Sequence, residues 1–375
     1  MQITIIQGAF LPVPPVCGGA VERIWYQLGQ QFAHMGHSVV HISRSYPGLS
    51  ANEMLNGVNH HRVQGFDMPA NILLLKYRDL RYSLRVVRDL PDADILITNT
   101  FWLPLLISQM SLRPGRTVVS VERMPKGQMF MYRNVSSFRC CTTAVRDCIL
   151  REQPQFASRA VVIPNPIPFR LDPIHPIPEK SPVILFVGRI HPEKGIDLLL
   201  RSFVRACELG LRGWTLRIVG PHHVIQGGAG TNWITKLKQL PLGIMHMVDW
   251  VGPIFDESRL QEEYRRASIF VYPSLADRGE AFGLAPLEAM AHASVPIVSS
   301  LPCFTDFIIN GHNGLIFNHR SPDAVSLLSD YLLQLTSEPL LLRTLSLNAF
   351  AVRHSHHPRT IANQMIAHFE SLMTV

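Results

Sequence analysis

Two carboxylates stand eight residues apart in the stretch GEAFGLAPLE, which runs from Gly279 to Glu288. Glu280 comes before a glycine-containing loop, and Glu288 lies about one turn inside an expected helix. A carboxylate is a good acceptor for vicinal hydroxyl groups, and the first amides of a helix are free to donate. The stretch therefore favours a polyhydroxylated ligand. The alternative is that Glu280 only complements the helix dipole and that Glu288 is an ordinary helix-surface residue.

Two cations stand at the end of another apolar run, in the stretch LFVGRIHPEKGIDLLL. The expected strand ends at Gly188, Arg189 follows at once, and Lys194 comes just before a glycine and an expected helix. Arginine offers a planar fork for phosphate oxygens, and lysine offers a mobile point charge. Beside a helix start, this spacing suits a diphosphate. The alternative is two surface cations near a turn.

The elements that must position these residues alternate between short apolar runs and helical patterns. Strand, helix and strand at this spacing predict βαβ units with a parallel sheet. The expected strands are residues 3–6, 38–42, 94–98, 117–121, 160–163, 183–188, 214–220, 268–274 and 295–300, and helices are expected within 20–37 and at 195–210, 256–267 and 284–293.

A proline-rich segment interrupts the alternation, with seven prolines in the twenty residues 163–182. Such a segment cannot be a regular helix or an interior strand, so we expect a stiff linker. The sequence thus predicts an α/β fold with two facing Rossmann-like domains and a cleft between them, where ligands bind at the carboxyl ends of the strands. The expected parts are a first domain (1–165), a linker (166–182), a second domain (183–357) and a C-terminal helix that crosses back to the first domain (358–375).

The composition is that of a globular protein with large cores, because 47% of the 375 residues are hydrophobic and 17% are charged. No apolar stretch approaches the roughly 18 residues of a spanning helix. The opening MQITIIQGAF is read as a first strand and not as a signal peptide, which predicts a cytoplasmic protein. The six cysteines form no CxxC pair, so free thiols are expected and no zinc site.

The charge is unevenly distributed. Residues 1–170 carry 18 Lys and Arg against 10 Asp and Glu, whereas residues 171–375 carry 17 against 18. One basic helix face is predicted by the three- and four-residue steps between Arg78, Arg81, Arg85 and Arg88. This face is compatible with peripheral contact with an anionic membrane, and a solvated basic face is the alternative. The segment lacks the grooves and aromatic platforms of a nucleic-acid binder, so no nucleic-acid partner is expected.

The stretches FVGRIHPEKGIDLLL and EAFGLAPLEAMAHASVPIVSS resemble the signature segments of the family-four retaining glycosyltransferases. That family has the two-Rossmann fold called GT-B. The segments IINGHNGLIF, PPVCGGAVERIWYQLGQQFAHMGHSVV and VVIPNPI also resemble parts of the family, so the resemblance spans nearly the whole chain. It implies metal-independent, retaining transfer of a hexose-type sugar from a nucleotide-diphosphate donor to a glycan or lipid-linked acceptor. The implied setting is cell-surface polysaccharide or glycolipid synthesis, in the cytoplasm or on the inner face of its membrane.

The resemblance also implies a role for each matched residue. Arg189 and Lys194 would neutralise the departing diphosphate, Glu280 would contact the hydroxyls of the transferred sugar, and Glu288 would bind the nucleotide ribose. No cofactor and no metal are expected, because the two cations supply the positive charge. Further donor contacts are expected from the backbone at Gly18, Gly19, Gly188, Ala281, Phe282, Gly283 and Leu284. The first domain would then lie on the acceptor side and the second would hold the donor.

One departure from the family concerns the first domain. The family often carries a histidine after a strand there, near the donor sugar, whereas this chain has Glu122 and Arg123. Either residue could have taken over a sugar contact, or the loop could be arranged differently. Two other functions stay open. A nucleotide-sugar epimerase or a phosphorylase also uses two Rossmann domains, although no motif for a pyridoxal-phosphate lysine is evident. The chain could also bind a nucleotide sugar as a non-catalytic partner of another transferase.

Overall fold

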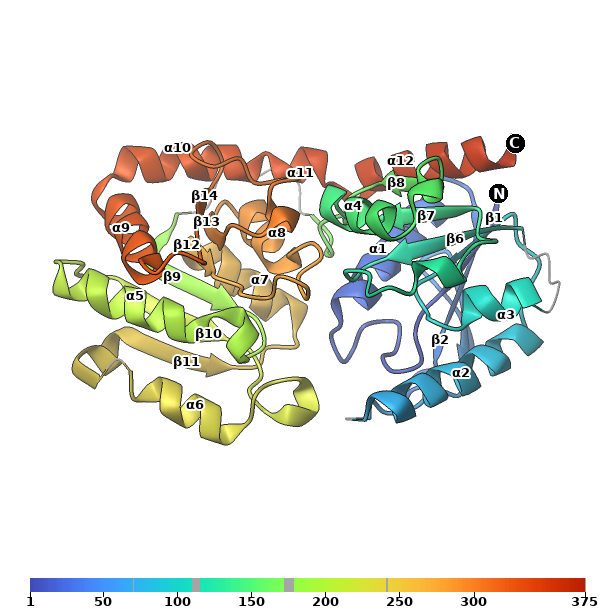
Figure 1. Cartoon of the computed structure of the whole chain (residues 1–375), viewed down its shortest axis with the longest axis horizontal. Helices are drawn as coiled ribbons and strands as arrows, with labels where there is room; N and C mark the ends of the chain where they lie inside the picture. Colours follow the sequence, from blue (N-terminus) through green and yellow to red (C-terminus); the bar gives the residue numbers. More distant parts are fainter. Residues whose placement is uncertain (70, 110–114, 172–178, 241, 375) are drawn as a thin grey trace. The chain divides into compact units, whose positions relative to one another are not determined.

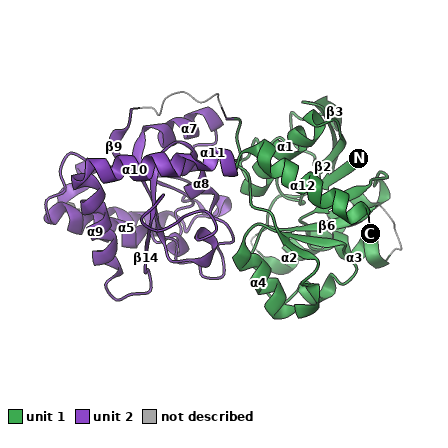
Figure 2. Cartoon of the chain, turned by 90° about the horizontal axis from the view of Figure 1, so that it is seen from above, with its two compact units in different colours: residues 1–170, 356–375 green, residues 171–355 purple. Residues whose placement is uncertain are grey.

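The computed structural model describes residues 1–69, 71–109, 115–171, 179–240 and 242–374. The chain divides into two compact units, which Figure 2 shows in different colours. Unit 1 comprises Met1–Arg170 and His356–Val375, and unit 2 comprises Leu171–Ser355. Each unit is a sheet covered by helices (Figure 1), so the chain has the α/β class that the alternation predicts.

Unit 1 is built on an eight-stranded sheet with the order β3-β4-β2-β1-β5-β6-β7-β8. All neighbouring strands run parallel except β3, which pairs antiparallel with β4. The strands are β1 (Gln2–Ile6), β2 (Ser38–Arg44), β3 (Asn52–Leu55), β4 (Val58–Val63), β5 (Ile95–Thr98), β6 (Arg116–Val121), β7 (Ser137–Cys140) and β8 (Ala160–Val162).

The described helices of unit 1 include one from the far end of the sequence. They are α1 (Ala20–His34), α2 (Ile72–Arg88), α3 (Leu103–Gln109), α4 (Thr143–Glu152) and α12 (Pro358–Met373). The ring of Phe369 on α12 packs edge-on against that of Phe32 on α1, with 5.9 Å between centroids. The Ile167 amide donates to the His356 carbonyl at 2.9 Å, and this bond fixes the chain where it re-enters unit 1. The last helix, expected from the sequence to return to the first domain, therefore lies in unit 1.

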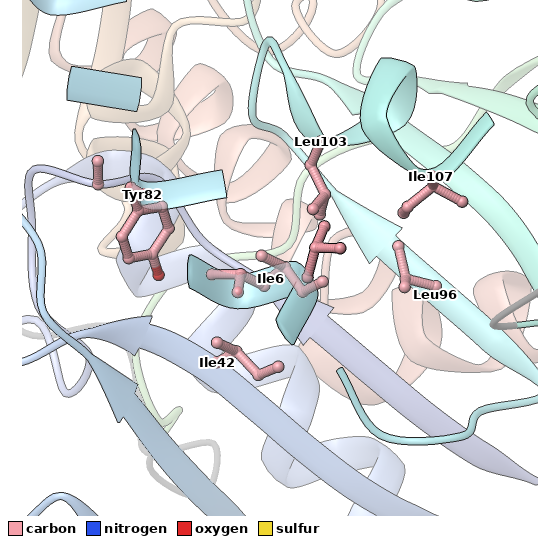
Figure 3. Close-up of a cluster of buried hydrophobic side chains, with 9 residues drawn as sticks. Ile6, Ile42, Tyr82, Leu96, Leu103 and Ile107 are labelled. Atoms are coloured by element: carbon pink, nitrogen blue, oxygen red, sulfur yellow. The ribbon is translucent and has the colours of Figure 1, made fainter. Parts of the chain in front are cut away.

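The core between the sheet and α2 shows how the inner face of this helix is chosen. Tyr82 and Val86 are buried on α2 against Ile6, Ile42 and Leu96 of three neighbouring strands (Figure 3). Burying a side chain of this size contributes about 1.5–3 kcal/mol. The inner face of α2 is therefore mostly apolar, and the polar Asp79 and Ser83 are buried there as well.

Unit 2 is built on a six-stranded, all-parallel sheet with the order β11-β10-β9-β12-β13-β14. The strands are β9 (Ser181–Val187), β10 (Thr215–Val219), β11 (Val248–Gly252), β12 (Ala267–Tyr272), β13 (Val295–Ser299) and β14 (Leu315–Phe317). The helices are α5 (Ile196–Glu208), α6 (Thr231–Lys238), α7 (Glu257–Arg266), α8 (Leu284–Ala291), α9 (Ala324–Ser337), α10 (Pro339–Phe350) and α11 (Val352–Ser355).

The expected elements are present to within two residues at most of their ends, and several short strands were not expected. The sequence analysis did not predict β3, β4, β7, β11 or β14, which are short or flanked by polar residues. It also placed the first boundary at 165 and extended the linker to 182, whereas unit 1 continues to Arg170 and β9 begins at Ser181. Residues 172–178 of the expected linker lie outside the described residues.

Two further expectations concern the cysteines and membrane-spanning helices. All six cysteines are free thiols. In the part of the chain that the structure describes, no helix is both long and apolar enough to cross a membrane.

Candidate functional site

The site in unit 2 lies where β9 and β12 end side by side. The two strands pair in parallel, and β10 flanks β9 on the other side. The strand order reverses between β9 and β12, and ligands of open α/β sheets bind outside the carboxyl ends of strands at such a reversal. The stretch after β9 carries Arg189 and Lys194, and the stretch after β12 carries Glu280. The fold therefore brings the two motifs of the sequence together.

A glycine and two hydrogen bonds to one backbone carbonyl hold the two loops against each other. Gly195 has φ 66°, and a Cβ there would lie 2.1 Å from the carbonyl oxygen of Pro273, so no other residue fits without movement. The carbonyl of Glu193 accepts from the Leu275 amide at 2.8 Å and from the Ser274 hydroxyl at 3.4 Å. Lys194 thereby has a fixed backbone position next to the loop of Glu280.

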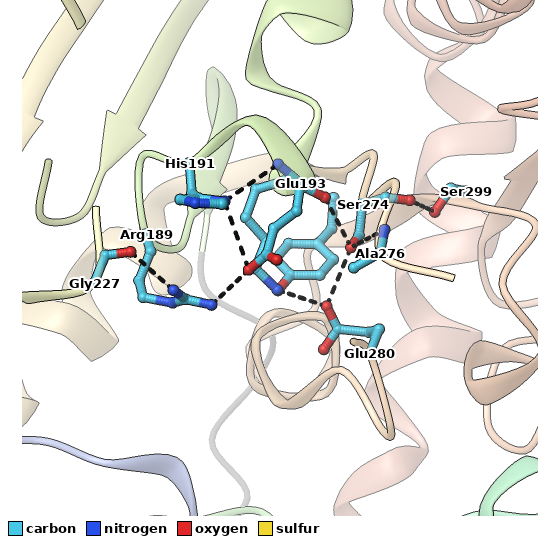
Figure 4. A network of polar contacts seen from close by, with 10 residues as sticks. Arg189, His191, Glu193, Gly227, Ser274, Ala276, Glu280 and Ser299 are labelled. Atoms are coloured by element: carbon cyan, nitrogen blue, oxygen red, sulfur yellow. Dashed lines mark hydrogen bonds and ion pairs between the residues drawn. The ribbon is translucent and has the colours of Figure 1, made fainter. Parts of the chain in front are cut away.

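Lys194 and Glu280 form an ion pair that is nearly enclosed. The Lys194 ammonium lies 2.7 Å from Oε2 of Glu280, and the two side chains are only 10% and 12% exposed. The same carboxylate oxygen accepts from the hydroxyl groups of Tyr272 at 3.1 Å and Ser274 at 3.2 Å, and Lys194 also donates to Tyr272 at 2.8 Å. Figure 4 shows this network, with Glu280 and Ser274 labelled. These contacts all use Oε2, and among the described residues no hydrogen bond or ion pair engages the second carboxylate oxygen of Glu280, so it can accept from a ligand.

The charges of this network are fixed by its surroundings. Burial lowers the pKa of the Lys194 ammonium, but the neighbouring Tyr272 and Glu280 outweigh this, so the pKa is raised. Burial is the main cause that raises the pKa of the Tyr272 hydroxyl, and the Glu280 carboxylate is the second. Near neutral pH the lysine is therefore a cation and the tyrosine is a neutral donor. The site presents a positive charge with an oriented carboxylate beside it, which fits an anionic, hydroxylated ligand.

Arg189 lies on the same loop and is more exposed than Lys194. Its Nη2 lies 2.6 Å from Oε1 of Glu193, and its Nη1 donates to the carbonyl of Gly227 at 2.8 Å. The strand end beneath it is tightly packed, since a Cβ on Gly220 would lie 1.8 Å from the carbonyl oxygen of Gly188. Gly188 thus supports a close backbone crossing, and any contact of Gly188 with a donor stays a prediction.

The loop before α8 differs from the expectation in one respect. Gly283 has φ 86°, and a Cβ there would lie 2.3 Å from the ring of Phe304. The space beside its Cα is therefore filled by Phe304, so a ligand can approach Gly283 only from its backbone N–H and carbonyl sides. The side chains of Ala281 and Phe282 are buried, and Phe282 stacks on Phe307. Only backbone groups of 281–283 remain for the expected donor contacts, while Leu284 is partly exposed.

Glu288 is buried on α8. It is 3% exposed, and one carboxylate oxygen accepts from the hydroxyl of Tyr264 at 2.8 Å. A buried carboxylate needs such donors to remain satisfied, so the ordinary helix-surface alternative for Glu288 is wrong. Its expected contact with a ribose stays a prediction.

In unit 1 the expected glycine pair begins α1. Gly18 and Gly19 have φ 73° and 101°, which is the left-handed region that favours glycine. The carboxylate of Glu22 folds back over Gly19, since a Cβ there would lie 2.2 Å from Oε2 of Glu22. Burial raises the pKa of Glu22 to about 7, and the charges of Arg123 and Glu122 act as smaller, opposed influences.

Glu22 should make stability depend on pH. Because the folded pKa is raised from 4.5 to about 7, the folded state holds a proton that the unfolded state has released, so the free energy of unfolding falls as pH rises from 4.5 to 7. We expect Glu22→Gln to gain stability relative to the wild type at pH 7 but little at pH 5, measured by urea unfolding. The exposed Asp92→Asn is the control. An equal difference at both pH values would contradict this assignment.

Glu122 and Arg123, the expected replacements for a histidine, have different environments. Oε1 of Glu122 accepts from Arg139 at 2.5 Å and from Ser120 at 2.7 Å, and Oε2 accepts from Asn165 at 3.2 Å. Both oxygens are therefore committed inside unit 1, which argues against the sugar contact expected for Glu122. Arg123 is exposed, and its contact with a sugar stays a prediction.

The structure adds three side chains that the sequence analysis missed: Tyr272, Ser274 and Glu193. Tyr272 and Ser274 flank the proline of VYPS at the end of β12, and polar residues closing an apolar strand were the available signal. Glu193 stands directly before Lys194 and four residues after Arg189, so its charge was visible but its partner was not. Within the described residues, no group of three or more His, Cys, Asp or Glu side chains could hold a metal ion.

Solved structures define the class of this fold. Sucrose-phosphate synthase from Thermosynechococcus elongatus superposes with a TM-score of 0.81 at 21% identity, covering 100% of this chain and 99% of that one. HepE of Anabaena, solved with UDP-glucose, superposes with a TM-score of 0.71 at 14% identity, covering 99% and 100%. The fold is thus that of the GT-B glycosyltransferases, with two parallel-sheet domains.

A family match lies almost entirely in unit 2. Residues 169–346 match the model of the family described as Glycosyl transferases group 1, so this part of the chain is similar to that family. D-inositol 3-phosphate glycosyltransferase 2 of Catenulispora acidiphila is 35% identical over 150 residues, which are 39% of this chain and 34% of the relative. Glycogen synthase of Thermus thermophilus is 27% identical over 146 residues, 39% of this chain and 30% of the relative. The matched part thus spans about a third of each relative's length.

Proposed function

We propose that this chain is a retaining glycosyltransferase that moves a hexose-type sugar from a nucleotide-diphosphate donor to a glycan or lipid-linked acceptor. The observation that carries the proposal is the enclosed Lys194–Glu280 pair, with Arg189 nearby, at the strand reversal of unit 2. A fixed cation beside an oriented carboxylate matches the two halves of such a donor, which are a diphosphate and a sugar. The family match in unit 2 supports the same reading.

The proposed roles follow from charge and position. Lys194 and Arg189 stabilise the negative charge that develops on the diphosphate as the sugar departs, which is the kind of electrostatic stabilisation that accelerates group transfer most. Glu280 accepts hydrogen bonds from the sugar hydroxyls through the oxygen that faces away from Tyr272 and Ser274. Glu288 holds the ribose. Holding donor and acceptor in one geometry supplies the rest of the rate enhancement.

The same cations support transfer without a metal ion, because they already supply the charge that a divalent cation would otherwise bring. The test is the rate of nucleoside diphosphate release from a panel of nucleotide sugars, with and without EDTA. UDP-sugars are the first donors to try, since HepE is solved with UDP-glucose. Turnover that survives EDTA supports both proposals. Turnover that needs added Mg²⁺ or Mn²⁺ would end the metal-independent mechanism.

Two rival functions are distinguished by the same assay. An epimerase would interconvert the nucleotide sugars and release only traces of nucleoside diphosphate, and a phosphorylase would require inorganic phosphate. A non-catalytic partner would bind the donor without turnover. Retention is then tested by NMR, which reports whether the anomeric configuration of the product equals that of the donor.

We also propose peripheral attachment to the inner face of the cytoplasmic membrane, where lipid-linked acceptors for polysaccharide or glycolipid synthesis would be reached. The support is α2, although its basic face differs from the expectation. Arg78 and Arg85 turn inward and donate to the carbonyls of Asp67 and Gln64, each at 2.6 Å. Four regularly spaced arginines therefore do not share one solvent-facing side.

The outward stripe of α2 instead mixes apolar and basic side chains at steps of three and four residues. Leu73, Tyr77 and Leu84 are 73%, 53% and 40% exposed, and Arg81 and Arg88 lie exposed between and after them. Apolar side chains that enter the headgroup region, with arginines that pair with lipid phosphates, are typical of interfacial helices.

Reversal of the two outward charges should abolish this attachment. Each basic residue near an anionic surface contributes about 1 kcal/mol, so Arg81→Glu together with Arg88→Glu should lower partitioning onto phosphatidylglycerol vesicles at least about tenfold. Sedimentation with anionic and with neutral vesicles measures this. Arg151→Glu, at an exposed position of α4, is the control. If wild-type protein stays in the supernatant with both kinds of vesicle, the attachment is wrong.

A further inference from the structure

Arg189, one of the two proposed phosphate-binding cations, already has a carboxylate partner in this structure. Its guanidinium donates to Oε1 of Glu193 at 2.6 Å and to the carbonyl of Gly227 at 2.8 Å (Figure 4). The Arg189 side chain also packs closely against Gly227, because a Cβ there would lie 2.9 Å from Cδ of Arg189. The side chain is thus held against the unit by a charge and by a close backbone contact.

The two ion pairs of the site differ in how firmly they are held. The Lys194–Glu280 pair is enclosed, and Tyr272 and Ser274 also bond to its carboxylate. The Arg189–Glu193 pair is 44% and 35% exposed. Besides Arg189, the His191 ring lies close to the Glu193 carboxylate, with its Nδ1 3.8 Å from Oε1. Exposed pairs of this kind contribute little net free energy, so the Arg189–Glu193 pair is the one that a ligand can displace.

The backbone of Glu193 is fixed independently of its side chain. Its amide donates to the His191 ring at 3.4 Å, and its carbonyl accepts from the Leu275 amide at 2.8 Å. The side chain can therefore leave Arg189 by rotating about its own bonds while Lys194 and the Glu280 loop stay in place. The structure combines a rigid cation site with one carboxylate that can move.

We propose that Glu193 is a positioning residue that pairs with Arg189 before the donor binds and gives way to the donor diphosphate. The inference rests on the proposed function. The Glu193 carboxylate competes with the phosphates for the guanidinium, so it weakens diphosphate binding and speeds release of the nucleoside diphosphate after transfer. Glu193 thus affects the affinity of the site for the diphosphate and the rate of product release. Lys194 and Glu280 instead affect the chemical step of sugar transfer.

The test compares Glu193→Gln with the wild type, because glutamine keeps the size and removes the charge. We expect Glu193→Gln to bind inorganic pyrophosphate and nucleoside diphosphates more tightly by roughly two- to fivefold in calorimetry, the range of an exposed ion pair. The gain should shrink at high salt, since exposed charges are screened. In turnover, KM for the donor and kcat should both fall, because the product leaves more slowly. Glu193→Asp, which keeps the charge, should stay near the wild type.

The matched control is Glu262→Gln. It removes the carboxylate partner of Arg265 from a similarly exposed pair on α7, and it should change no affinity. Weaker or unchanged pyrophosphate binding in Glu193→Gln would overturn the inference, because it would mean that Glu193 helps or does not affect anion binding. If the wild type binds nucleotides but Glu193→Gln binds them no more tightly, this inference is overturned and the proposed function is not. A gain for pyrophosphate in a protein that binds no nucleotide would overturn the proposed donor and leave the role of Glu193 standing.

Discussion

Lys194→Met is expected to reduce sugar transfer by about 10²–10³-fold, the loss typical of removing one electrostatic contact to a transition state. The ammonium group is held in place by Glu280 and Tyr272, and methionine supplies no positive charge at that position. Glu280→Gln should produce a loss of similar size, because the carboxylate that orients both the lysine and the sugar becomes a neutral amide. The rate of nucleoside diphosphate release under saturating donor measures both effects.

The matched control for these variants is Lys236→Met, at an exposed position of α6. It should turn over at the wild-type rate. Circular dichroism and a melting curve must accompany each variant, because removing one partner of an enclosed ion pair also destabilises the fold. A folded Lys194→Met or Glu280→Gln variant with the wild-type rate would place the chemistry elsewhere.

Arg139→Met should be the most destabilising single change in unit 1, with a loss of about 3–5 kcal/mol in the free energy of unfolding. Arg139 is fully enclosed, donates to Glu122 at 2.5 Å and to Asn165 at 2.6 Å, and its ion pair with Glu122 is 2% and 5% exposed. Methionine fills part of the space but leaves the Glu122 carboxylate buried without its cation. Urea unfolding measures this loss in the free energy of unfolding.

A double variant separates this explanation from a simple loss of packing. Glu122→Leu added to Arg139→Met removes the stranded charge, so the pair should recover much of the lost stability. The exposed Arg81→Met is the control and should stay within about 0.5 kcal/mol of the wild type. A loss below about 1 kcal/mol for Arg139→Met would contradict a buried, uncompensated charge.

The sequence was sufficient for the fold class and for placing the candidate site residues at strand ends, and the reason is local. Apolar runs that end in a polar or glycine residue predict parallel strands and their carboxyl ends, and Arg189, Lys194 and Glu280 all follow such ends. The contact between Lys194 and Glu280 could not be predicted in this way. It depends on β9 lying beside β12, which are distant in the sequence.

The structure adds detail that the sequence could not supply where partners come from other elements. Glu122 was one of two residues considered for a sugar contact, and its cation comes from β7, a short strand that the pattern did not reveal. Gly283 was expected to contribute backbone contacts, and the ring of Phe304 fills the space beside its Cα from a separate turn; the donor contacts stay predictions. The arginines of α2 have a helical period, yet the ring of Phe66 draws Arg78 and Arg85 toward the unit, with cation-to-centroid distances of 5.8 and 5.0 Å.

The central claim is that unit 2 holds a nucleotide-sugar donor through Lys194 without a metal ion. The most direct measurement is a thermal-shift screen of the wild type and of Lys194→Met against UDP-, GDP-, ADP- and dTDP-sugars, with EDTA present. A ligand that binds only the folded state must raise the melting temperature. The account predicts that one nucleotide class raises it in the wild type, and that the same ligand produces little or no rise in Lys194→Met. An equal rise in both proteins, or no rise with any donor, would contradict it.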